Sequence, residues 1–147
     1  MSEAESDVQL HDFKNIFSLH GKVAVVTGGS RGLGLHAASG LLQAGCAKVI
    51  ITSRKPAACD AAAAALNALP NLAPGARAYS VPADCSSVAD IARLVREVEL
   101  LTDHVDILFA NAGATWGAEF LAVDERNGWD RVMDLNVKGV FFAVQKY

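Results

Sequence analysis

The sequence lacks the features that would place the protein in a membrane or on nucleic acid. Its uninterrupted apolar runs, such as residues 107–110, are short, whereas a membrane-spanning helix needs about 20 apolar residues. Basic residues are not in excess, because 13 Lys and Arg stand against 16 Asp and Glu and give a net charge of −3. An acidic chain has little electrostatic attraction for phosphate backbones. We therefore expect a soluble protein that binds neither membranes nor nucleic acid.

Cysteine is scarce, and its spacing matches no redox or metal motif. Cys46, Cys59 and Cys85 are an odd number, lie far apart, and form no Cys-x-x-Cys pair. No histidine stands at metal-ligand spacing from them, so we expect three free thiols and no metal site. Residues 1–17 are acidic and contain neither the basic nor the apolar stretch of a secretory signal. These features predict a cytoplasmic protein.

What the sequence does contain is enough apolar material for one folded domain. Its 147 residues are 52% hydrophobic and 20% charged, a composition that argues against disorder. A domain of this size buries roughly 68–70% of the surface of its unfolded chain. Residues 1–19 are polar, and we interpret them as a lead-in to a single domain over residues 20–147.

Four short apolar strands alternate with helical segments along the chain. The strands are expected over residues 22–27, 48–52, 76–81 and 105–110. They are apolar on both faces, as in strands buried in a parallel sheet. Helical spacing follows Leu33 and Pro56, Ser87 with Asp90 resembles a capping box, and a last helix is expected from about Trp129. The alternation predicts an α/β protein: a doubly wound parallel sheet with helices on both faces.

A glycine-rich loop joins the first strand to the first helix and reads Thr-Gly-Gly-Ser-Arg-Gly-Leu-Gly over residues 27–34. Gly28 allows a sharp turn off the strand, Gly32 lets the backbone approach a diphosphate, and Gly34 lets the helix pack on the sheet. The free N–H groups and the dipole of the helix N-terminus favour phosphate charge. No Gly-Lys-Ser/Thr ends the loop, which excludes a kinase-type phosphate loop. The unit predicts a Rossmann-type dinucleotide-binding fold.

The residues after the second strand favour NADP(H) over NAD. An acidic residue at that place would bond the ribose 2′-hydroxyl of NAD. Here the sequence reads Ser53-Arg54-Lys55, and Arg31 lies in the glycine loop. A guanidinium group offers forked, charged donors to a 2′-phosphate. The alternative is that Arg54 and Lys55 belong to a solvated loop without a ligand.

The glycine loop resembles that of the short-chain dehydrogenase/reductase family. It matches the family's Thr-Gly-x-x-x-Gly-x-Gly signature at every fixed position, and the resemblance extends over residues 21–147. Epimerase-like relatives with an extended chain carry a glycine where Arg31 stands, so the resemblance is to the non-extended type. It implies a Rossmann-type sheet and hydride transfer between a nicotinamide cofactor and a carbonyl or alcohol group.

Further motifs follow in the order that the family has. Asp84 and Cys85 correspond to its adenine contacts, and residues 111–113 resemble its Asn-Ala-Gly segment, although Ala110 replaces the usual preceding asparagine. Asn136 corresponds to the asparagine of the family's catalytic tetrad. The expected cofactor-binding residues are Gly28, Ser30, Arg31, Gly32, Leu33, Gly34, Ser53, Arg54, Asp84, Cys85, Asn111, Ala112 and Gly113.

The serine and the Tyr-x-x-x-Lys of the family belong downstream of the asparagine. Tyr147 lies eleven positions after Asn136 and has no lysine four residues on, so we do not interpret it as catalytic. In the strand order 3-2-1-4, the apolar fourth strand would also form an open edge. We therefore expect a sheet truncated after the fourth strand and the following helix. The chain would be the cofactor-binding part of an NADP(H)-dependent oxidoreductase, inactive alone.

The resemblance is loosely to 3-oxoacyl thioester reductases and implies a small carbonyl or alcohol substrate for the full-length protein. Family members are commonly tetramers, so a homo-oligomer stays open. The alternative is a non-catalytic dinucleotide-binding or interaction module, in which the free edge of the fourth strand pairs with a partner chain.

Overall fold

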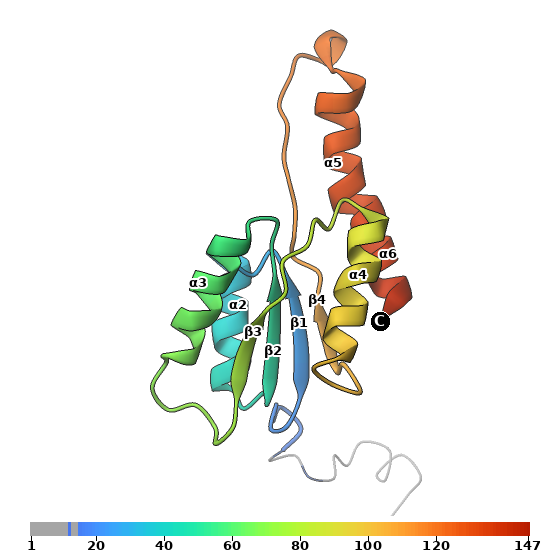
Figure 1. The fold of residues 1–147 in the computed structure, drawn as a ribbon. Coiled ribbons are helices and arrows are strands. Elements are labelled where there is room, and N and C mark those ends of the chain that lie inside the picture. Colours follow the sequence, from blue (N-terminus) through green and yellow to red (C-terminus); the bar gives the residue numbers. More distant parts are fainter. Residues whose placement is uncertain (1–11, 13–14) are drawn as a thin grey trace, which may run out of the picture.

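A four-stranded parallel sheet forms the centre of the computed structural model, which describes Asp12 and residues 15–147 (Figure 1). The sheet has the order β3-β2-β1-β4. Its strands are β1 (Val23–Thr27), β2 (Lys48–Thr52), β3 (Arg77–Ser80) and β4 (Ile107–Phe109). In register, Val25 of β1 lies opposite Ile50 on one side and Leu108 on the other. The predicted parallel sheet and its strand order are confirmed.

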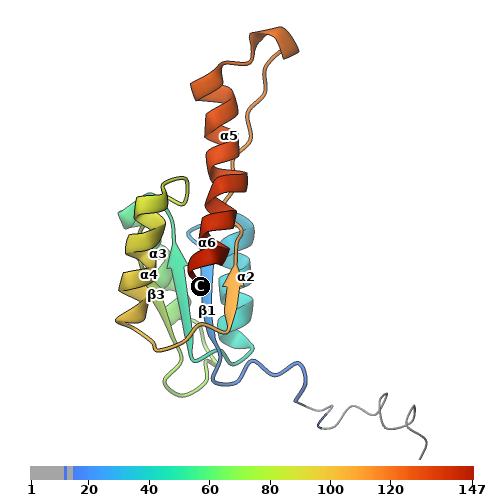
Figure 2. The same ribbon diagram turned by 90° about the vertical axis from the view of Figure 1, so that its right-hand side faces the viewer.

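Helices cover both faces of the sheet, which confirms the doubly wound α/β architecture (Figures 1 and 2). Three are regular: α2 (Gly32–Gln43), α3 (Pro56–Asn67) and α4 (Val88–Glu99). After β4 come η1 (Phe120–Ala122), η2 (Glu125–Asp130), α5 (Arg131–Met133), η3 (Asp134–Gly139) and α6 (Val140–Lys146). The pair α2 and α3 lies on one face, while α4 and α6 lie side by side on the other.

The core consists of two apolar layers separated by the sheet. Because successive strand residues point to opposite faces, β1 contributes Ala24 and Val26 to the layer under α2 and α3. It contributes Val25 to the layer under α4, where Leu94 and Val98 are fully buried or nearly so. All five residues of β1 are buried, so this central strand fixes the position of the loop that follows it.

Strand β4 is shorter and more exposed than its sequence predicts. The expected strand over residues 105–110, buried on both faces, is a three-residue strand whose side chains are half-buried or exposed, with Phe109 at 42%. Within the described residues, β4 pairs with β1 alone, so no second neighbouring strand covers its other edge. β4 is short and exposed because it lies at the edge of the sheet. The apolar composition of a strand does not reveal whether the strand lies at an edge.

The last helical segment begins earlier than its sequence predicts. Helical structure starts at Glu125, and the Asp124 carboxylate accepts a hydrogen bond from the Asn127 N–H at 2.6 Å. The start expected near Trp129 is therefore wrong, because Gly128 lies inside the helix instead of ending a loop. Gly128 is buried, and a Cβ there would lie 3.1 Å from the Trp116 ring. Its missing side chain makes room for the tryptophan.

The predicted lead-in over residues 1–19 falls mostly outside the described residues, which omit 1–11 and 13–14. Nearer the sheet, Leu19 packs on the core layer under α2 and α3. The Gly21 N–H donates to the Gly45 carbonyl at 3.1 Å, which ties this segment to the end of α2. The proposed division at residue 19 stays a prediction. Across the described part of the chain, no helix is both long and apolar enough to cross a membrane.

Candidate dinucleotide-binding site

The glycine loop leaves β1 through backbone conformations that favour glycine. Gly28 and Gly32 have φ angles of +68° and +54°, in the left-handed region. Gly34 has an ordinary φ but no room: a Cβ there would collide with the Gly28 carbonyl and the Asn111 amide. The loop therefore turns sharply at both ends and brings the start of α2 directly against the carboxyl end of the sheet.

The N-terminus of α2 is free to receive an anion. Arg31 occupies the N-cap position in an extended conformation, and among the described residues no side chain caps the helix and no acid stands in its first turn. Ser30 is half-buried, whereas Arg31 and Leu33 are exposed, Leu33 at 81%. The unpaired N–H groups of the first turn carry partial positive charge and point outward, which suits a diphosphate.

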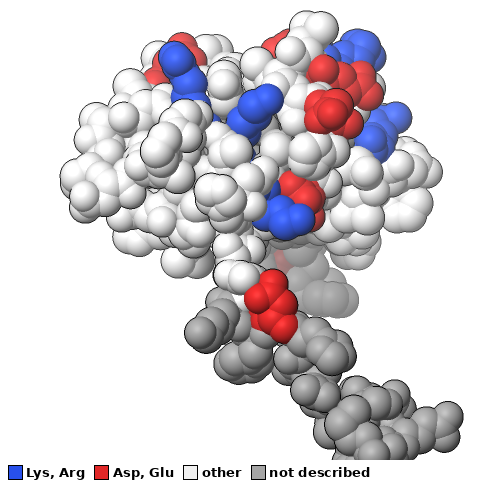
Figure 3. Space-filling model, turned by 90° about the horizontal axis from the view of Figure 1, so that it is seen from below, with Lys and Arg blue, Asp and Glu red and all other residues white. Residues whose placement is uncertain are grey.

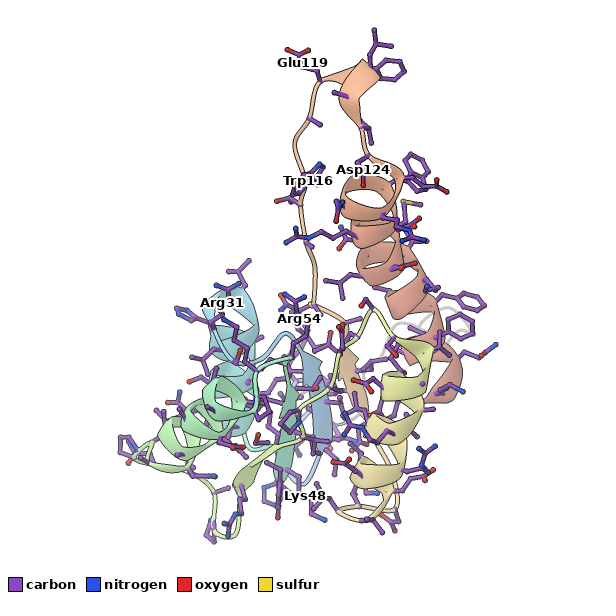
Figure 4. All side chains as sticks on the ribbon, turned by 45° about the horizontal axis from the view of Figure 1, so that its top comes forward. Arg31, Lys48, Arg54, Trp116, Glu119 and Asp124 are labelled. Carbon is purple, nitrogen blue, oxygen red and sulfur yellow. The ribbon has the colours of Figure 1, made fainter. Side chains whose placement is uncertain are left out.

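The end of β2 supplies a second polar position at the same end of the sheet. Figure 4 shows Arg31 and Arg54 both at the carboxyl ends of the strands. Arg54 is exposed, whereas the Ser53 hydroxyl oxygen is buried and has no hydrogen-bond partner among the described residues. A buried hydroxyl without a partner costs roughly 1–3 kcal/mol. Rotation of this side chain towards a ligand at Arg54 would remove that cost.

The acidic residue predicted to meet adenine is held in the turn before α4. One Asp84 carboxylate oxygen accepts from the Ser86 N–H at 2.9 Å and from its hydroxyl at 2.7 Å. The Asp84 N–H donates to the Asp90 carboxylate at 3.0 Å. The predicted capping box is thus half present: Ser87 caps the Asp90 N–H at 3.3 Å, but Asp90 bonds Asp84 instead of Ser87.

Cys85 lies behind this turn as a buried thiol. Burial, together with the negative charges of Asp84 and Asp90, raises its pKa to about 11. The thiol is therefore protonated and unreactive at neutral pH. Its backbone carbonyl passes so close to Gly139 that no Cβ fits there, and this contact seats η3 on the sheet end. Any contact of Cys85 with a ligand would have to come from its backbone.

The loop after β4 is bonded directly to the end of β1. The Asn111 side-chain amide donates to the Thr27 carbonyl at 3.0 Å, and the Ala112 N–H donates to the Thr27 hydroxyl at 2.9 Å. Since Asn111 also lies against Gly28 and Gly34, it braces the glycine loop from below. The sequence marked residues 111–113 as ligand contacts but did not identify Thr27 as their anchor. A hydroxyl residue at the end of a buried strand was the available signal.

Asn136 fastens the helical segment to the same loop. Its side-chain oxygen accepts from the Ala114 N–H and its nitrogen donates to the Ala114 carbonyl, both at 2.8 Å. This pairing uses one of the two lone pairs of the amide oxygen and one of the two N–H groups of the amide nitrogen, so the side chain and the backbone could each hold a water. Asn136 lies in η3, one of two wide π-type turns in the segment, and such turns often occur at functional sites.

Tyr147 follows α6, is 36% exposed, and lies near Cys85 and Glu99. Burial, followed by the nearby Cys85 and Glu99, raises the pKa of its phenol. This direction is opposite to that needed by a proton donor working near neutral pH. A cavity of about 10 Å³, room for roughly one water, remains between Thr27, Cys85 and the helix. Within the described residues, no three acidic, histidine or cysteine side chains gather as a metal site would need.

Comparison with known proteins places this geometry in a family. The family described as short chain dehydrogenase matches residues 22–147. The chain belongs to this family. The predicted resemblance is thereby confirmed, including the oxidoreductase class of the relatives.

Among curated proteins, the chain is 43% identical over 130 residues to a 3-oxoacyl-[acyl-carrier-protein] reductase of rhamnolipid biosynthesis from Pseudomonas aeruginosa. That match covers 88% of this chain and 48% of the relative. A 2-dehydro-3-deoxy-D-gluconate 5-dehydrogenase from Escherichia coli is 41% identical, over 88% of this chain and 47% of its own length. The chain thus spans about half the length of the curated relatives it matches.

Solved structures agree with the sequence matches. The Pseudomonas aeruginosa RhlG/NADP active-site complex has a TM-score of 0.79 at 41% identity, covering 93% of this chain and 49% of that one. A 3-oxoacyl-(acyl-carrier-protein) reductase from Agrobacterium tumefaciens with NADP bound has a TM-score of 0.77 at 30% identity, covering 95% and 51%. The short-chain dehydrogenase fold and its NADP complexes thus match the present chain over most of its length.

Proposed function

We propose that this chain is the cofactor-binding part of an NADP(H)-dependent oxidoreductase that moves hydride between the nicotinamide and a carbonyl or alcohol group. The observation that carries the proposal is the N-terminus of α2, which no side chain of the described residues caps. It lies at the same end of the sheet as Arg54 and as the Ser53 hydroxyl, which has no partner within those residues. One position suits a diphosphate and the other suits a 2′-phosphate. The NADP complexes of the similar solved proteins support the same choice.

We propose selection of NADP(H) over NAD because basic side chains, and no acidic one, stand directly after β2. No carboxylate follows β2, where NAD enzymes place one to bond the 2′-hydroxyl. Instead Ser53 offers a hydroxyl that no other part of the described structure bonds, and Arg54 and Arg31 offer guanidinium groups. A dianionic 2′-phosphate would pair with these groups, whereas a neutral hydroxyl would leave them largely unused.

We assign the remaining site residues by their positions relative to the proposed diphosphate and 2′-phosphate sites. Asp84 and the Cys85 backbone would meet adenine, and residues 111–113 would lie along the nicotinamide-side ribose. Bound NADPH supplies the hydride. Asn136 holds the loop at Ala114 through its amide, and we assign it the anchoring of a water in the proton relay. The full proposed set is Gly28, Ser30, Arg31, Gly32, Leu33, Gly34, Ser53, Arg54, Asp84, Cys85, Asn111, Ala112, Gly113 and Asn136.

The wider setting follows from the same family membership. A small carbonyl or alcohol compound is the proposed substrate of the whole protein, since the matched reductase and dehydrogenase act on such groups by their names. We propose a homo-oligomer because members of the family are commonly tetramers. Three free buried thiols fit a reducing compartment and support a cytoplasmic location.

Titration of the folded chain with NADPH and with NADH tests the proposal, with circular dichroism as the check on folding. We expect tighter binding of NADPH. Arg54→Ala should weaken NADPH binding about 10- to 100-fold, the loss of a charge-assisted hydrogen bond to phosphate. Binding of NADH should change little in the same variant, because NADH lacks the 2′-phosphate.

Arg96→Ala is the matched control, because Arg96 is an exposed arginine on α4. Equal losses for NADPH and NADH in the Arg54 variant would refute the 2′-phosphate assignment. A folded chain that binds neither nucleotide would refute cofactor binding itself. Tight binding without any turnover once the chain is part of the whole protein would favour the non-catalytic module.

A further inference from the structure

A group of charged side chains joins β4 to β1 at the amino end of the strands, opposite the glycine loop. In Figure 3, which shows this end of the molecule, basic and acidic side chains lie next to one another. Asp106 precedes β4, and its carboxylate accepts from the Lys22 ammonium at 2.8 Å and from the Val23 N–H at 2.8 Å. The Asp106 N–H in turn donates to the Val23 carbonyl at 2.9 Å. Asp106 therefore extends the pairing of β1 with β4 at the amino end of both strands, before the pair Ala24 and Ile107.

His104 lies between two carboxylates of this group. Its Nδ1 is 2.7 Å from an Asp103 oxygen, and its Nε2 is 3.3 Å from the Asp106 oxygen that also receives the Val23 N–H. Ionised carboxylates only accept hydrogen bonds, and a neutral imidazole carries a single N–H. Only an imidazolium, with an N–H on each ring nitrogen, presents a donor to both carboxylates at once.

We propose that His104 is a proton-dependent bridge that fastens the edge strand β4 to β1 through Asp106. When protonated, it spans Asp103 and Asp106 and holds the Asp106 carboxylate against the Val23 N–H. When neutral, it has a single N–H for the two carboxylates and loses the charge that attracts both acids. The device lies at the opposite end of the sheet from the proposed cofactor site and does not depend on that assignment.

The other charges around His104 set the pH range of the bridge. The hydrogen bond to Asp103 chiefly raises the pKa of His104 above its usual 6.5, and the charge of Asp106 acts in the same direction. His104 chiefly lowers the pKa of Asp103 from 3.8, with a small contribution from Lys48, and Lys22 chiefly lowers that of Asp106. Lys48 itself donates to the Leu101 carbonyl at the end of α4.

The pKa shifts of His104, Asp103 and Asp106 together define a pH range in which the bridge stabilises the folded state. A raised histidine pKa stabilises the folded state fully below 6.5, and this contribution disappears as pH rises through the folded value. A lowered carboxyl pKa stabilises it above 3.8, and that contribution disappears as pH falls through the folded value. The bridge is therefore complete between about pH 4 and the raised pKa of His104, and it opens as pH rises through that pKa.

Amide hydrogen exchange at Val23 tests the proposal, because this N–H donates to the carboxylate that His104 contacts. The whole chain and its His104→Gln variant are compared at about pH 5.5 and about pH 8.5, on either side of histidine titration. Comparison at equal pH cancels intrinsic exchange. We expect Val23 to exchange about twofold to fivefold faster in the variant at the lower pH, the scale of an exposed ion pair. At the higher pH the two should agree.

His36→Gln is the matched control, since His36 is an exposed histidine on α2, whose helix covers the other face from α4. It should leave Val23 exchange unchanged at both pH values. Asp103→Asn supplies a second readout, because loss of that partner should lower the His104 pKa measured by NMR. Equal Val23 exchange in the chain and in His104→Gln at both pH values, or an unmoved His104 pKa in Asp103→Asn, would overturn the proposal.

Discussion

Thr27, Asn111 and Gly34 form the tightest point of the candidate site. The threonine holds the loop after β4 through its carbonyl and its hydroxyl, and the asparagine amide fills the space that Gly34 leaves. The glycine is therefore required by packing, not by backbone conformation. A side chain at this position has nowhere to go, since both neighbours are part of the bonded framework.

Gly34→Ala should destabilise the chain by about 1–3 kcal/mol, as overpacking of a rigid site does. The new methyl would press on the Gly28 carbonyl and the Asn111 amide, so NADPH binding should fall as well. Chemical denaturation and nucleotide titration measure the two effects.

Gly40→Ala is the control for this change. Gly40 lies in the same helix, and a Cβ there would meet nothing within 4 Å. Alanine should stabilise the helix at that position by up to about 1 kcal/mol. A Gly34 variant as stable as the Gly40 variant would contradict the packing argument.

At the level of single residues, the sequence indicated candidate site residues but not how they contact one another. The assignment of the glycines, Arg54 and Asn136 to the site stays a prediction. The bonds from Asn111 to Thr27 and from Asn136 to Ala114 join positions 84 and 22 residues apart. Such pairs depend on the strand order and on the path of a loop, so no local pattern reveals them.

Among the elements, α4 has the best-defined start. Ser87 accepts from the Asp90 N–H, while the Asp90 carboxylate ties back to Asp84 in the preceding turn. The helix start and the predicted adenine contact thus share one hydrogen-bonded turn. A substitution of Ser87 should therefore also disturb the hydrogen bond between Asp90 and Asp84.

Ser87→Ala should lower the free energy of unfolding by about 1 kcal/mol, the usual cost of losing an N-cap hydroxyl. Ser87→Gly should cost only a few tenths of a kcal/mol (roughly 0.2–0.4 kcal/mol), because glycine is itself an acceptable cap. Urea denaturation of both variants checks the ranking. If alanine and serine proved equally stable, the 3.3 Å contact would carry no cap energy.

The bounds of an element could be predicted where neighbouring residues in the sequence determine them. The predictions were wrong where the bounds depend on residues far away in the sequence. The runs of β2 and the proline at the start of α3 give bounds that agree with the structure. The extent of β4 depends on its place at the sheet edge. The start of the last helical segment depends on Trp116, which packs on Gly128 from another part of the chain.

For the molecule as a whole, three buried thiols report on the core layer under α2 and α3 and on the carboxyl end of the sheet. Cys46 and Cys59 have no exposed surface and lie under α2 and α3, while Cys85, at 7%, lies at the carboxyl end of the sheet. Native labelling by a thiol reagent therefore requires the structure to open.

We expect native labelling at about pH 8 to be at least 100-fold slower than labelling in denaturant. For Cys85 the pKa of about 11 adds a second barrier, because only about one thiol in a thousand is ionised at that pH. Mass spectrometry of quenched samples gives the rate at each cysteine. Fast labelling of any one of the three in the native chain would show that its layer of the core is open.

The central position of β1 has a consequence for synthesis on the ribosome. One neighbour, β2, follows after a single helix, but Ala24 pairs on its other side with Ile107, 83 residues later. At 5–20 residues per second, translation of that interval takes roughly 4–17 seconds. For this time one edge of β1, the strand whose five residues are all buried in the final fold, lacks its final partner, and so do the carbonyl and hydroxyl of Thr27. The nascent chain is then most prone to pair with a foreign strand, and most in need of a chaperone.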